Sequence, residues 1–476
     1  AGYDYSREIF RSPAVTQNYE LSIAGGGEKT TFLASLRYQD DQGIIKESGS
    51  QIYSWRLKVD TKIKKWLKAG LNIYGHYRET SKPRITEYDG LIQQSMYFPS
   101  TIEPKNEEGE YNNSFFDGGK AYNPMGYIWE SSNSNKTINN RIQGYVQFDI
   151  LDGLSFRSQL GVLFDNRLNT SVENEDSYYS YKNSLTQGQA RSYWNTSWLN
   201  TNTLSYDFRD LLPGEHSLNF MIGQENVVIR ESKTTARVEG FPDFYDAQMA
   251  FNFSAQGTPT KYDEFFYQDD KMLSVFGRLN YDYKGRYLFS GTLRADGSSK
   301  FARGNRWGYF PSVALGWRVV EESWMESAKD WLSNLKLRLS YGISGNNNIP
   351  SGQTTKNYSI TQSSWLNIAD SYLTAGTAMN NTNLQWETTH SLNVGLDFGF
   401  FNNKLNGSLE VYKNNVKNLL MEMQVAGCGY NTQYQNVGET QNSGFEITLN
   451  YTAVNTKDYG LDFAFTLGRN KNKVVS

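Results

Sequence analysis

Period-two alternation of apolar and polar residues constrains the fold of this chain more than any other feature of its sequence. Three such segments follow one another closely: Val275–Tyr283, Tyr287–Arg294 and Trp307–Val319. Because successive side chains of a β-strand point to opposite faces, alternation predicts strands with one apolar and one polar face. The short Lys284-Gly285-Arg286 connection between the first two segments predicts a tight hairpin turn.

The same alternation continues along most of the chain. In His390–Phe400, for example, Leu392 and Val394 fall on one face, while Asn393 and Asp397 fall on the other. We predict about sixteen strands with an average length of about ten residues. Strands of that length suit a membrane crossing better than the soluble average of about five or six residues. The expected fold class is therefore all-β, an antiparallel transmembrane β-barrel.

The predicted connections between strands alternate in length. Every second connection is short, and these lie around Gly26, Lys64, Asp152, Pro213, Gly285, Ser323–Trp331, Asn403 and Lys457. The remaining connections are generally longer, and they include Glu79–Asn140, Asn166–Arg191, Ile229–Asp269 and Gly345–Asn381. Outer-membrane barrels have this asymmetry, with short periplasmic turns and long outer loops. A β-sandwich or propeller gives no reason for it.

Composition agrees with a barrel and argues against other classes of protein. Aromatic residues make up 15% of the 476 residues, with 33 Tyr and 26 Phe, yet the mean hydropathy is only −0.63. This combination is expected where only alternate residues face lipid. The net charge of −3 argues against nucleic-acid binding. A single Cys428 and three widely separated His leave no metal-ligand spacing, so neither a metal nor a cofactor is expected.

One stretch of about fifty residues carries a family signature. It runs R-x-DGSS-x-F, N-RWG-x-FPS and GWR in one order and ends with two acidic residues. The residues are Arg294, Asp296, Gly297, Ser298, Ser299, Phe301, Asn305, Arg306, Trp307, Gly308, Phe310, Pro311, Ser312, Gly316, Trp317, Arg318, Glu321 and Glu322. This stretch closely resembles the signature segment of SusC/RagA-type TonB-dependent outer-membrane transporters. The GG-x-EKT pattern from Gly25 to Thr30 resembles the first barrel hairpin of the same family.

The resemblance implies a larger architecture than the predicted strands account for. Family members close a barrel of twenty-two strands around an N-terminal plug. Residues 1–16 are accordingly expected to lead in from a plug, and residues 17–476 to form a partial transmembrane β-barrel. A self-contained barrel of sixteen strands is the less favoured alternative.

The resemblance also implies partners and a location. Family members sit in the outer membrane of Gram-negative, Bacteroidetes-like bacteria, in contact with lipid and lipopolysaccharide. A TonB complex energises them through the N-terminal region, and a SusD-like surface lipoprotein closes over the barrel as a lid. Dimers of such transporter–lipoprotein pairs are expected here, and no nucleic acid.

Several charged residues invite a functional interpretation. Arg294, Asp296, Arg306 and Glu321-Glu322 could contact a ligand, but we favour a network that fixes strand register, because Asp296-Gly297 is turn chemistry. Asp263-Glu264 and Asp269-Asp270 could bind calcium, although their spacing matches no known calcium loop. No nucleophile motif or phosphate-cradling glycine loop is present in the sequence, so no catalytic residue is assigned and the protein is not expected to be an enzyme.

Aromatic residues in the predicted outer loops are the better candidates for ligand contact. Aromatic faces stack on sugar rings and grip apolar side chains, although packing within large loops would also explain them. The candidates are Tyr97, Phe98, Tyr111, Phe115, Phe116, Trp129, Tyr178, Tyr179, Phe265, Phe266, Tyr267 and Trp365. Strand aromatics such as Tyr281, Tyr283, Phe398 and Phe400 are predicted to face lipid instead.

The favoured function is TonB-energised import of oligosaccharides across the outer membrane. A strongly anionic polysaccharide would require clustered Lys and Arg, whereas Lys261, Lys271 and Arg191 are far apart in the sequence. Import of peptides is the first alternative. A binding or structural barrel that transports nothing is the second, and a soluble β-rich enzyme is a distant third.

Overall fold

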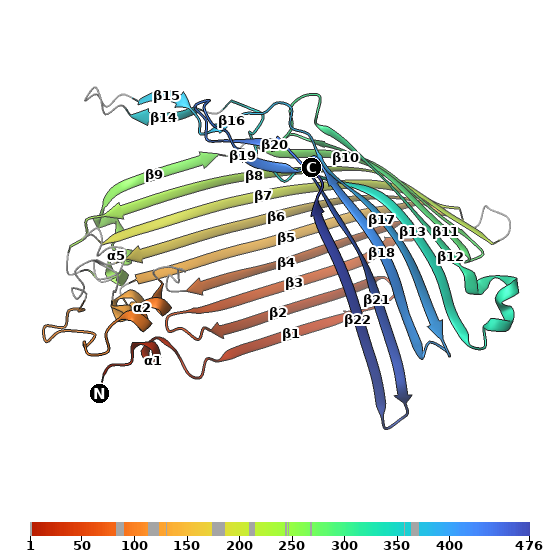
Figure 1. Cartoon of the computed structure of the whole chain (residues 1–476), viewed down its shortest axis with the longest axis horizontal. Helices are drawn as coiled ribbons and strands as arrows, with labels where there is room; N and C mark the ends of the chain where they lie inside the picture. Colours follow the sequence, from red (N-terminus) through yellow and green to blue (C-terminus); the bar gives the residue numbers. More distant parts are fainter. Residues whose placement is uncertain are drawn as a thin grey trace.

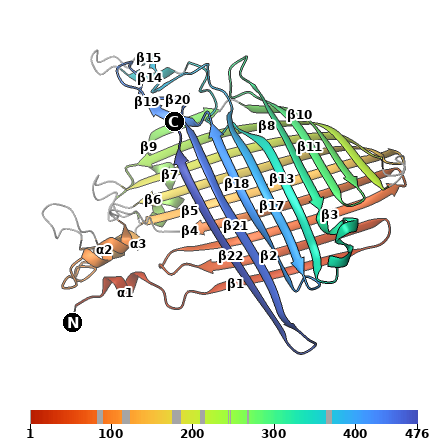
Figure 2. The same ribbon diagram turned by 45° about the vertical axis from the view of Figure 1, so that its right-hand side comes forward.

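The alternating segments form one large antiparallel sheet in the computed structural model (Figure 1). The structure describes residues 2–81, 90–112, 123–129, 131–173, 186–208, 215–242, 245, 247–266, 269–356, 358–362 and 371–476. The sheet curls into a section of a cylinder whose strands run obliquely to one another at the two sides (Figures 1 and 2). The predicted all-β barrel architecture is confirmed.

Each strand of the sheet pairs with its neighbours in the chain. The first half comprises β1 (Thr16–Gly26), β2 (Thr30–Gln42), β3 (Gly49–Lys64), β4 (Leu67–Ser81), β5 (Ser131–Leu151), β6 (Leu154–Glu173), β7 (Gln187–Asp207) and β8 (His216–Glu239). The second half comprises β9 (Thr258–Phe266), β10 (Asp270–Tyr283), β11 (Tyr287–Ser298), β12 (Trp307–Arg318), β13 (Leu332–Asn346), β17 (Glu387–Phe400), β18 (Leu405–Lys417), β21 (Glu439–Asn455) and β22 (Gly460–Val474).

Two of these strands share one partner. β9 pairs with β8 from Phe266 opposite Ser232, and β10 continues along the same strand from Asp270 opposite Ile229. β9 and β10 therefore occupy the position of one interrupted strand. Counted in this way, the 17-stranded sheet has sixteen strand positions, in agreement with the predicted count. The bounds of several strands differ from the prediction, because β9, the outer half of β8 and the outer parts of β5, β6 and β7 lie in segments predicted as loops.

The connections show the predicted asymmetry. Tight turns close the hairpins at one end of the sheet, as at Lys284 and Gly285, whose φ angles of 58° and 61° suit the two central residues of a type I′ turn. Ser323–Trp331 contains the expected helical turn, the 3₁₀ helix η3 (Ser323–Ala328), after η2 (Val319–Glu321). The longer connections lie at the opposite end. Those that follow β4, β6 and β8 are shorter than predicted, because β5, β6, β7 and β8 continue through polar segments with little apolar alternation.

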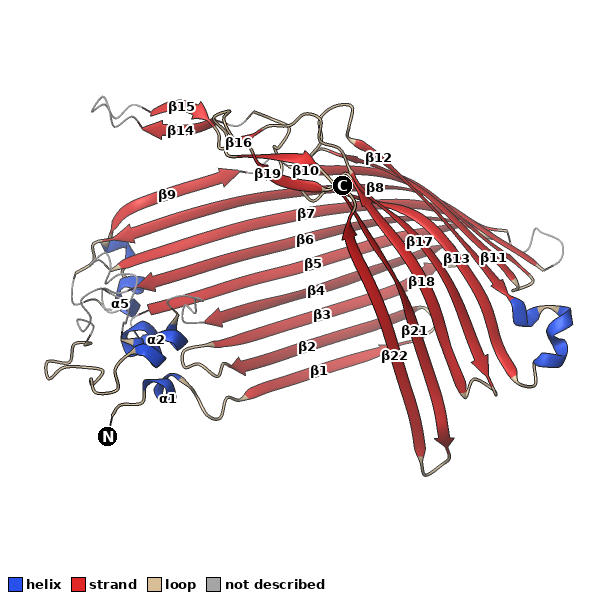
Figure 3. Cartoon of the chain, in the orientation of Figure 1, coloured by secondary structure: helices blue, strands red, loops and turns tan. Residues whose placement is uncertain are grey.

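The described α-helices, the 3₁₀ helix η1 and two small sheets lie at the long-connection end, away from η2 and η3 (Figure 3). They are α1 (Tyr5–Ile9), α2 (Leu91–Tyr97), α3 (Pro124–Trp129), α5 (Ala247–Asn252) and η1 (Ser254–Gln256), with β14 (Tyr358–Gln362), β15 (Ser371–Ala375), β16 (Ala378–Met379), β19 (Leu420–Gln424) and β20 (Thr432–Asn436). No helix in the described ranges is long and apolar enough to cross a membrane. Ile9, Ile45, Leu91 and Ile128 form a small buried core among α1, α2 and α3.

The two faces of the sheet differ in chemistry. On β13 and β17, Leu337, Leu339 and Val394 are 41–47% exposed on one face, although they are apolar. Arg338 and Asp397 lie on the other face and are less exposed, as expected on the concave side of a curved wall. We call these the apolar outer face and the polar lumenal face.

Aromatic side chains gather near both ends of the outer face. Toward the tight turns, Trp66 stacks on Phe148 at 6.2 Å and Trp331 stacks on Phe400 at 5.9 Å between ring centroids. Toward the long connections, Tyr19, Tyr38, Tyr53 and Tyr77 form a ladder across β1 to β4. Aromatic belts of this kind mark the two interfaces of a membrane-embedded wall.

Candidate functional site

Charged side chains of the lumenal face join neighbouring strands. Arg338 of β13 donates from Nη2 to Asp397 Oδ1 on β17 at 2.8 Å and to Glu410 Oε1 on β18 at 2.7 Å. Its Nε donates to the second Asp397 oxygen at 2.8 Å. The planar guanidinium suits this forked arrangement. One cation thus connects three strands, and two carboxylates neutralise it.

Arg294 of the signature stretch makes similar contacts on another section of the lumenal face. Its Nε donates to Asp296 Oδ1 at 2.7 Å, and its Nη2 donates to Glu225 Oε1 at 2.9 Å and to Ser274 Oγ at 2.8 Å. These partners lie on β11, β8 and β10. The contacts are those that a register-fixing network requires, and they pair both carboxylates with the guanidinium rather than with a ligand cation.

The acidic end of the signature lies at the tight-turn end of the sheet. Glu322 is buried, and it accepts hydrogen bonds from Trp317 Nε1 at 2.9 Å, from Arg286 Nη1 at 3.0 Å and from the Tyr287 hydroxyl. Because these donors favour the carboxylate form, led by the Tyr287 hydroxyl, the pKa of Glu322 lies below its usual value. Glu322 therefore joins the ends of β11 and β12 to the connection that follows.

The middle of the signature anchors a long connection. Phe301, Phe310, Ile349, Leu384 and Trp386 form a buried cluster, in which the last three residues pack both ends of the connection between β13 and β17 against the wall. The carbonyl of Arg306 accepts a hydrogen bond from Trp386 Nε1 at 2.9 Å, and Arg306 Nε donates to the Phe301 carbonyl. Gly308 leaves room for the Phe310 ring.

The remaining signature residues have structural surroundings too. A Cβ at Gly297 would lie 3.0 Å from the Trp307 ring, so glycine permits that ring to cover the strand. Pro311 stands just before Ser312, where pairing of β12 with β13 begins, so its missing N–H is tolerated. Gly316 packs against Leu288, and Arg318 ends β12 with its backbone N–H donating to the Arg286 carbonyl at 2.9 Å.

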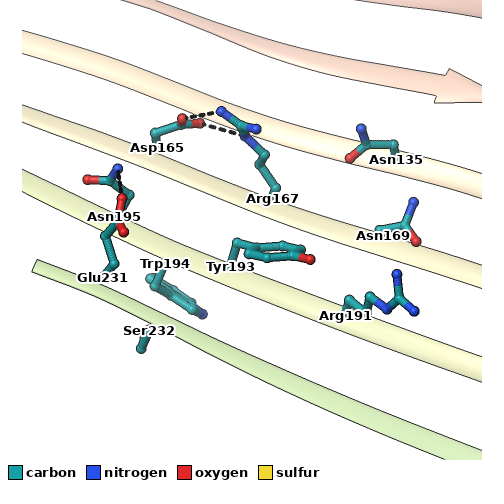
Figure 4. A pocket seen from close by; sticks show the side chains of 10 residues that line it. All are labelled: Asn135, Asp165, Arg167, Asn169, Arg191, Tyr193, Trp194, Asn195, Glu231 and Ser232. Carbon is teal, nitrogen blue, oxygen red and sulfur yellow. Dashed lines mark hydrogen bonds and ion pairs between the residues drawn. The ribbon is translucent and has the colours of Figure 1, made fainter. Parts of the chain in front are cut away.

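A polar pocket of about 520 Å³ lies on β5 to β8, toward the long-connection end (Figure 4). Most of its side chains come from the lumenal face. The lining residues are Asn135, Asp165, Arg167, Asn169, Arg191, Tyr193, Trp194, Asn195, Glu231 and Ser232. The register places Asp165, Arg167 and Asn169 opposite Asn195, Tyr193 and Arg191, so two polar strand segments meet in one site.

Positive and negative charges balance in this pocket, and two of its amide oxygens have no hydrogen-bond partner. Arg167 Nη2 lies 2.8 Å from Asp165 Oδ2, and Asn195 Nδ2 donates to Glu231 Oε1 at 3.0 Å. Lys233 Nζ lies 5.5 Å from the centre of the Tyr193 ring. The Oδ1 atoms of Asn135 and Asn195 are buried without a hydrogen-bond partner. The pocket therefore offers an aromatic ring and unused amide acceptors beside balanced charges.

The structure corrects one expectation about charge. Arg191 is not isolated, because pairing of β6 with β7 places it in the same pocket as Arg167. Lys261 pairs with Asp263 at 2.8 Å, and Lys271 lies 3.9 Å from Asp269. Two further carboxylates considered for calcium are also ion-paired: Asp269 contacts Arg230 at 3.0 Å, and Asp270 contacts Lys300 at 3.4 Å, whereas Glu264 accepts a hydrogen bond from the Tyr262 hydroxyl.

None of the aromatic loop candidates that the structure describes lines this pocket. Tyr97 and Trp129 are exposed at the ends of α2 and α3, and Phe265 is exposed on β9. Phe98 is 4% exposed and packs edge-on against Tyr5, with Tyr111 beside the same cluster, so these two rings serve packing. Phe266 ends β9. The other candidates, Phe115, Phe116, Tyr178, Tyr179, Tyr267 and Trp365, lie outside the described residues.

Sequence reasoning missed the pocket because it placed residues 166–191 in a loop. A signal was nevertheless present. Asp165, Arg167 and Asn169 alternate on one face, and Arg191, Tyr193 and Asn195 do so on the next strand. The opposite face of these segments holds few apolar residues, among them Leu168 and Trp194, so a criterion based on regular apolar alternation did not detect the strands.

Comparisons with known proteins agree on the family. The family described as "TonB dependent receptor-like, beta-barrel" matches residues 86–474. TonB-dependent receptor P26 of Formosa agariphila is 31% identical over 479 residues, which cover 98% of this chain and 46% of that protein. TonB-dependent receptor SusC of Bacteroides thetaiotaomicron is 28% identical over 510 residues, which cover 100% of this chain and 48% of SusC.

Solved structures agree on the fold. A chain of the RagAB peptide importer in its 'closed-closed' state superposes with a TM-score of 0.84 at 25% identity, covering 100% of this chain and 52% of that chain. The chain therefore spans about half the length of the relatives it matches.

Proposed function

The chain belongs to the TonB-dependent receptor-like β-barrel family, and on that premise we propose that the whole protein imports oligosaccharides across the outer membrane of a Gram-negative bacterium. Residues 17–476 supply barrel wall and connections in this proposal, and residues 1–16 lead into them. The wall supports it by its form, with an apolar outer face, a polar lumenal face and aromatic belts at both ends.

The choice of cargo class rests on the balance of positive and negative charges on the lumenal face. Arg294, Arg338 and Arg167 are each paired with one or two carboxylates. A wall with balanced charges attracts a polyanion weakly. Hydroxyl-rich cargo is served by the Tyr193 ring and the unpaired amide oxygens of Asn135 and Asn195. A neutral or weakly charged oligosaccharide fits these groups best.

The proposed partners follow from the family resemblance. A SusD-like surface lipoprotein would rest on the long connections, such as those between β4 and β5 and between β8 and β9. The TonB complex would act through regions of the protein that this chain does not span. Pairs of these complexes would associate in the membrane, surrounded by lipid and lipopolysaccharide.

Import of peptides is the second candidate function. The observation in its favour is the superposition on the RagAB peptide importer, with a TM-score of 0.84. Balanced charge and an aromatic ring also suit an uncharged stretch of peptide.

Growth tests separate the two cargo classes. A strain lacking the full-length gene should fail to grow on one class of purified neutral glycans, and it should grow normally on protein hydrolysate. Complementation with the full-length gene should restore growth on the glycan. Loss of growth on hydrolysate alone would transfer the proposal to peptides, and normal growth on every substrate would favour a barrel that transports nothing.

A further inference from the structure

One arginine of the polar pocket has no carboxylate partner. Arg191 lies on the side of the pocket nearer the long connections, two positions along β7 from Tyr193 (Figure 4). Arg167 of the same pocket pairs with Asp165 at 2.8 Å, whereas Arg191 forms no ion pair with any residue in the described ranges. A guanidinium does not lose its proton in proteins, so Arg191 keeps a positive charge that no carboxylate contacts.

A second guanidinium lies beside Arg191. The register places Arg237 of β8 opposite Gln189, which lies on the same face of β7 as Arg191. The Gln189 amide oxygen accepts hydrogen bonds from Arg191 Nη2 at 3.3 Å and from Arg237 Nη2 at 3.4 Å. With the amide turned over, its oxygen stays on Arg191, at 3.2 Å from Nη2 and 3.3 Å from Nε. One neutral oxygen thus lies between two cations. We call Gln189, Arg191 and Arg237 the arginine subsite.

The carboxylates around the arginine subsite are engaged elsewhere or lie at the limit of contact. Glu239 Oε1 is 4.0 Å from Arg237 Nη1. Asp263 on the adjacent β9 is held by a lysine of its own strand at 2.8 Å. Glu173 and Glu231 accept hydrogen bonds from neighbouring amide side chains. Arg237 Nε is buried without a hydrogen-bond partner. The two guanidiniums therefore have more donors than the wall supplies with acceptors.

We infer that the arginine subsite binds one carboxylate of the cargo, carried by an acidic sugar unit of an otherwise neutral oligosaccharide. A carboxylate would replace the Gln189 oxygen, and its two oxygens match the planar fork of a guanidinium. Hydrogen bonds between charged groups are roughly twice as strong as those to a neutral amide. The inference rests on the proposed function and narrows its substrate class.

The neighbouring ring of Tyr193 fits the same ligand. Side chains two positions apart on a strand are separated by about 7 Å, which is comparable to one sugar ring. A sugar unit that places its carboxylate on Arg191 therefore brings itself or the next unit over Tyr193, which lines the same pocket.

The surrounding charges favour one carboxylate over many. Asp165 and Glu231 line the same pocket, and Asp263 lies opposite the buried Thr235 on the next strand pair. These carboxylates repel further anionic groups on the cargo. The arginine subsite therefore selects a weakly acidic glycan and not a polyanion.

A pair of ligands that differ in one group tests the arginine subsite. The full-length protein with its lipoprotein would be titrated with a neutral oligosaccharide that supports growth, and with the same oligosaccharide in which one primary hydroxyl is oxidised to a carboxylate. The native protein should bind the carboxylated form about tenfold more tightly at about 0.05 M salt, and the preference should shrink at about 0.5 M salt. Gln189→Glu should abolish the preference, because an internal carboxylate then occupies both guanidiniums. Arg191→Gln should abolish it by removing one of them.

Two further variants serve as controls. Lys336→Gln removes a cation from the lumenal face of the distant β13, and it should leave the preference unchanged. Tyr193→Ala should weaken binding of both ligands alike, because the ring contacts the sugar and not the carboxylate. Unchanged affinity of Gln189→Glu and Arg191→Gln for the neutral ligand would show that these proteins are folded and have lost only the recognition of charge.

The outcomes distinguish the arginine subsite from the proposed function. Equal affinity of the native protein for the two ligands would overturn the subsite and leave import of oligosaccharides in place. A preference that survives both Gln189→Glu and Arg191→Gln, or that disappears in Lys336→Gln, would also overturn it. Failure of the native protein to bind either ligand would overturn the proposed function and this inference with it.

Discussion

Guanidinium groups held between carboxylates recur on the lumenal face, and each joins residues that are distant in sequence. Arg294 contacts Glu225, which lies 69 positions away, and Arg338 contacts Glu410, which lies 72 positions away. Such contacts contribute to register because a strand shifted by one residue would turn the partner carboxylate to the outer face.

Replacement of Arg338 with Met should show the strength of such a network. The change leaves Asp397 and Glu410 close together without a cation. Because all three side chains are about 30% exposed, water screens some of the effect, and we expect a loss of about 1–2 kcal/mol in the free energy of unfolding. Urea unfolding followed by tryptophan fluorescence would measure it. Lys336→Met, on the same face of β13, is the control and should change the unfolding free energy little; equal losses would contradict the assigned role.

Glu322 should make stability depend on pH. Hydrogen bonds from Tyr287 and Trp317 and the charge of Arg286 keep its pKa below the usual value. A carboxyl with a lowered folded-state pKa contributes stability fully above its unfolded pKa, about 4.3, and that contribution is lost as the pH falls through the folded-state value. Unfolding free energies measured from neutral to acid pH should therefore fall more steeply below that pH in the native protein than in Glu322→Gln. Parallel profiles would show that these bonds do not stabilise the carboxylate.

At the scale of strands, apolar and polar alternation predicted those hairpins whose outer-face residues meet the apolar membrane. It succeeded for His390–Phe400, which forms β17 almost residue for residue, with bounds Glu387–Phe400. It failed for β9, where Pro259, Lys261 and Asp263 alternate with residues that are no more apolar. The predicted strand corresponding to β5 was also too short, because the outer section of β5 begins with the polar sequence Ser-Ser-Asn-Ser-Asn-Lys. Beyond the membrane both faces of a strand are in water, so backbone pairing alone defines the strand and leaves little trace in hydropathy.

A matched pair of substitutions on β5 tests the two faces. Val146 is 39% exposed on the outer face, and Gln143 lies on the lumenal face of the same strand. Val146→Arg should impair assembly by about 2–4 kcal/mol if the site lies near the membrane midplane, whereas Gln143→Arg should be tolerated. The yield of folded protein in the outer membrane and the free energy of unfolding in lipid vesicles would measure both. Equal effects would contradict the assignment of faces.

At the scale of the whole molecule, the candidate site depends on features that one strand does not reveal. Arg167 and Arg191 are separated by 24 positions, and only the β6–β7 register places them in one pocket (Figure 4). The aromatic residues of the predicted loops are poor guides to the site, because contacts with distant segments can bury them. Phe98 lies in a segment predicted as a loop, yet Tyr5 and Met125 from two other segments bury it. Local sequence reports residue type, whereas access to the lumen is decided by packing between distant segments.

Charge balance over the lumenal wall predicts how cargo binding responds to salt. Because Arg167, Arg294 and Arg338 of the wall are paired with carboxylates, the full-length protein with its lipoprotein should bind a neutral oligosaccharide with an affinity that changes by less than about threefold between about 0.05 and 0.5 M salt.

Loss of the ring in Tyr193→Ala should weaken binding by about tenfold, equivalent to about 1.4 kcal/mol. Tyr193→Phe keeps the ring and should retain most of the affinity, which separates stacking from hydrogen bonding by the hydroxyl. Calorimetric titration across that salt range would measure all three proteins. A steep fall of affinity with salt would identify an anionic cargo instead, and competition by an uncharged peptide but not by the glycan would favour the peptide importer.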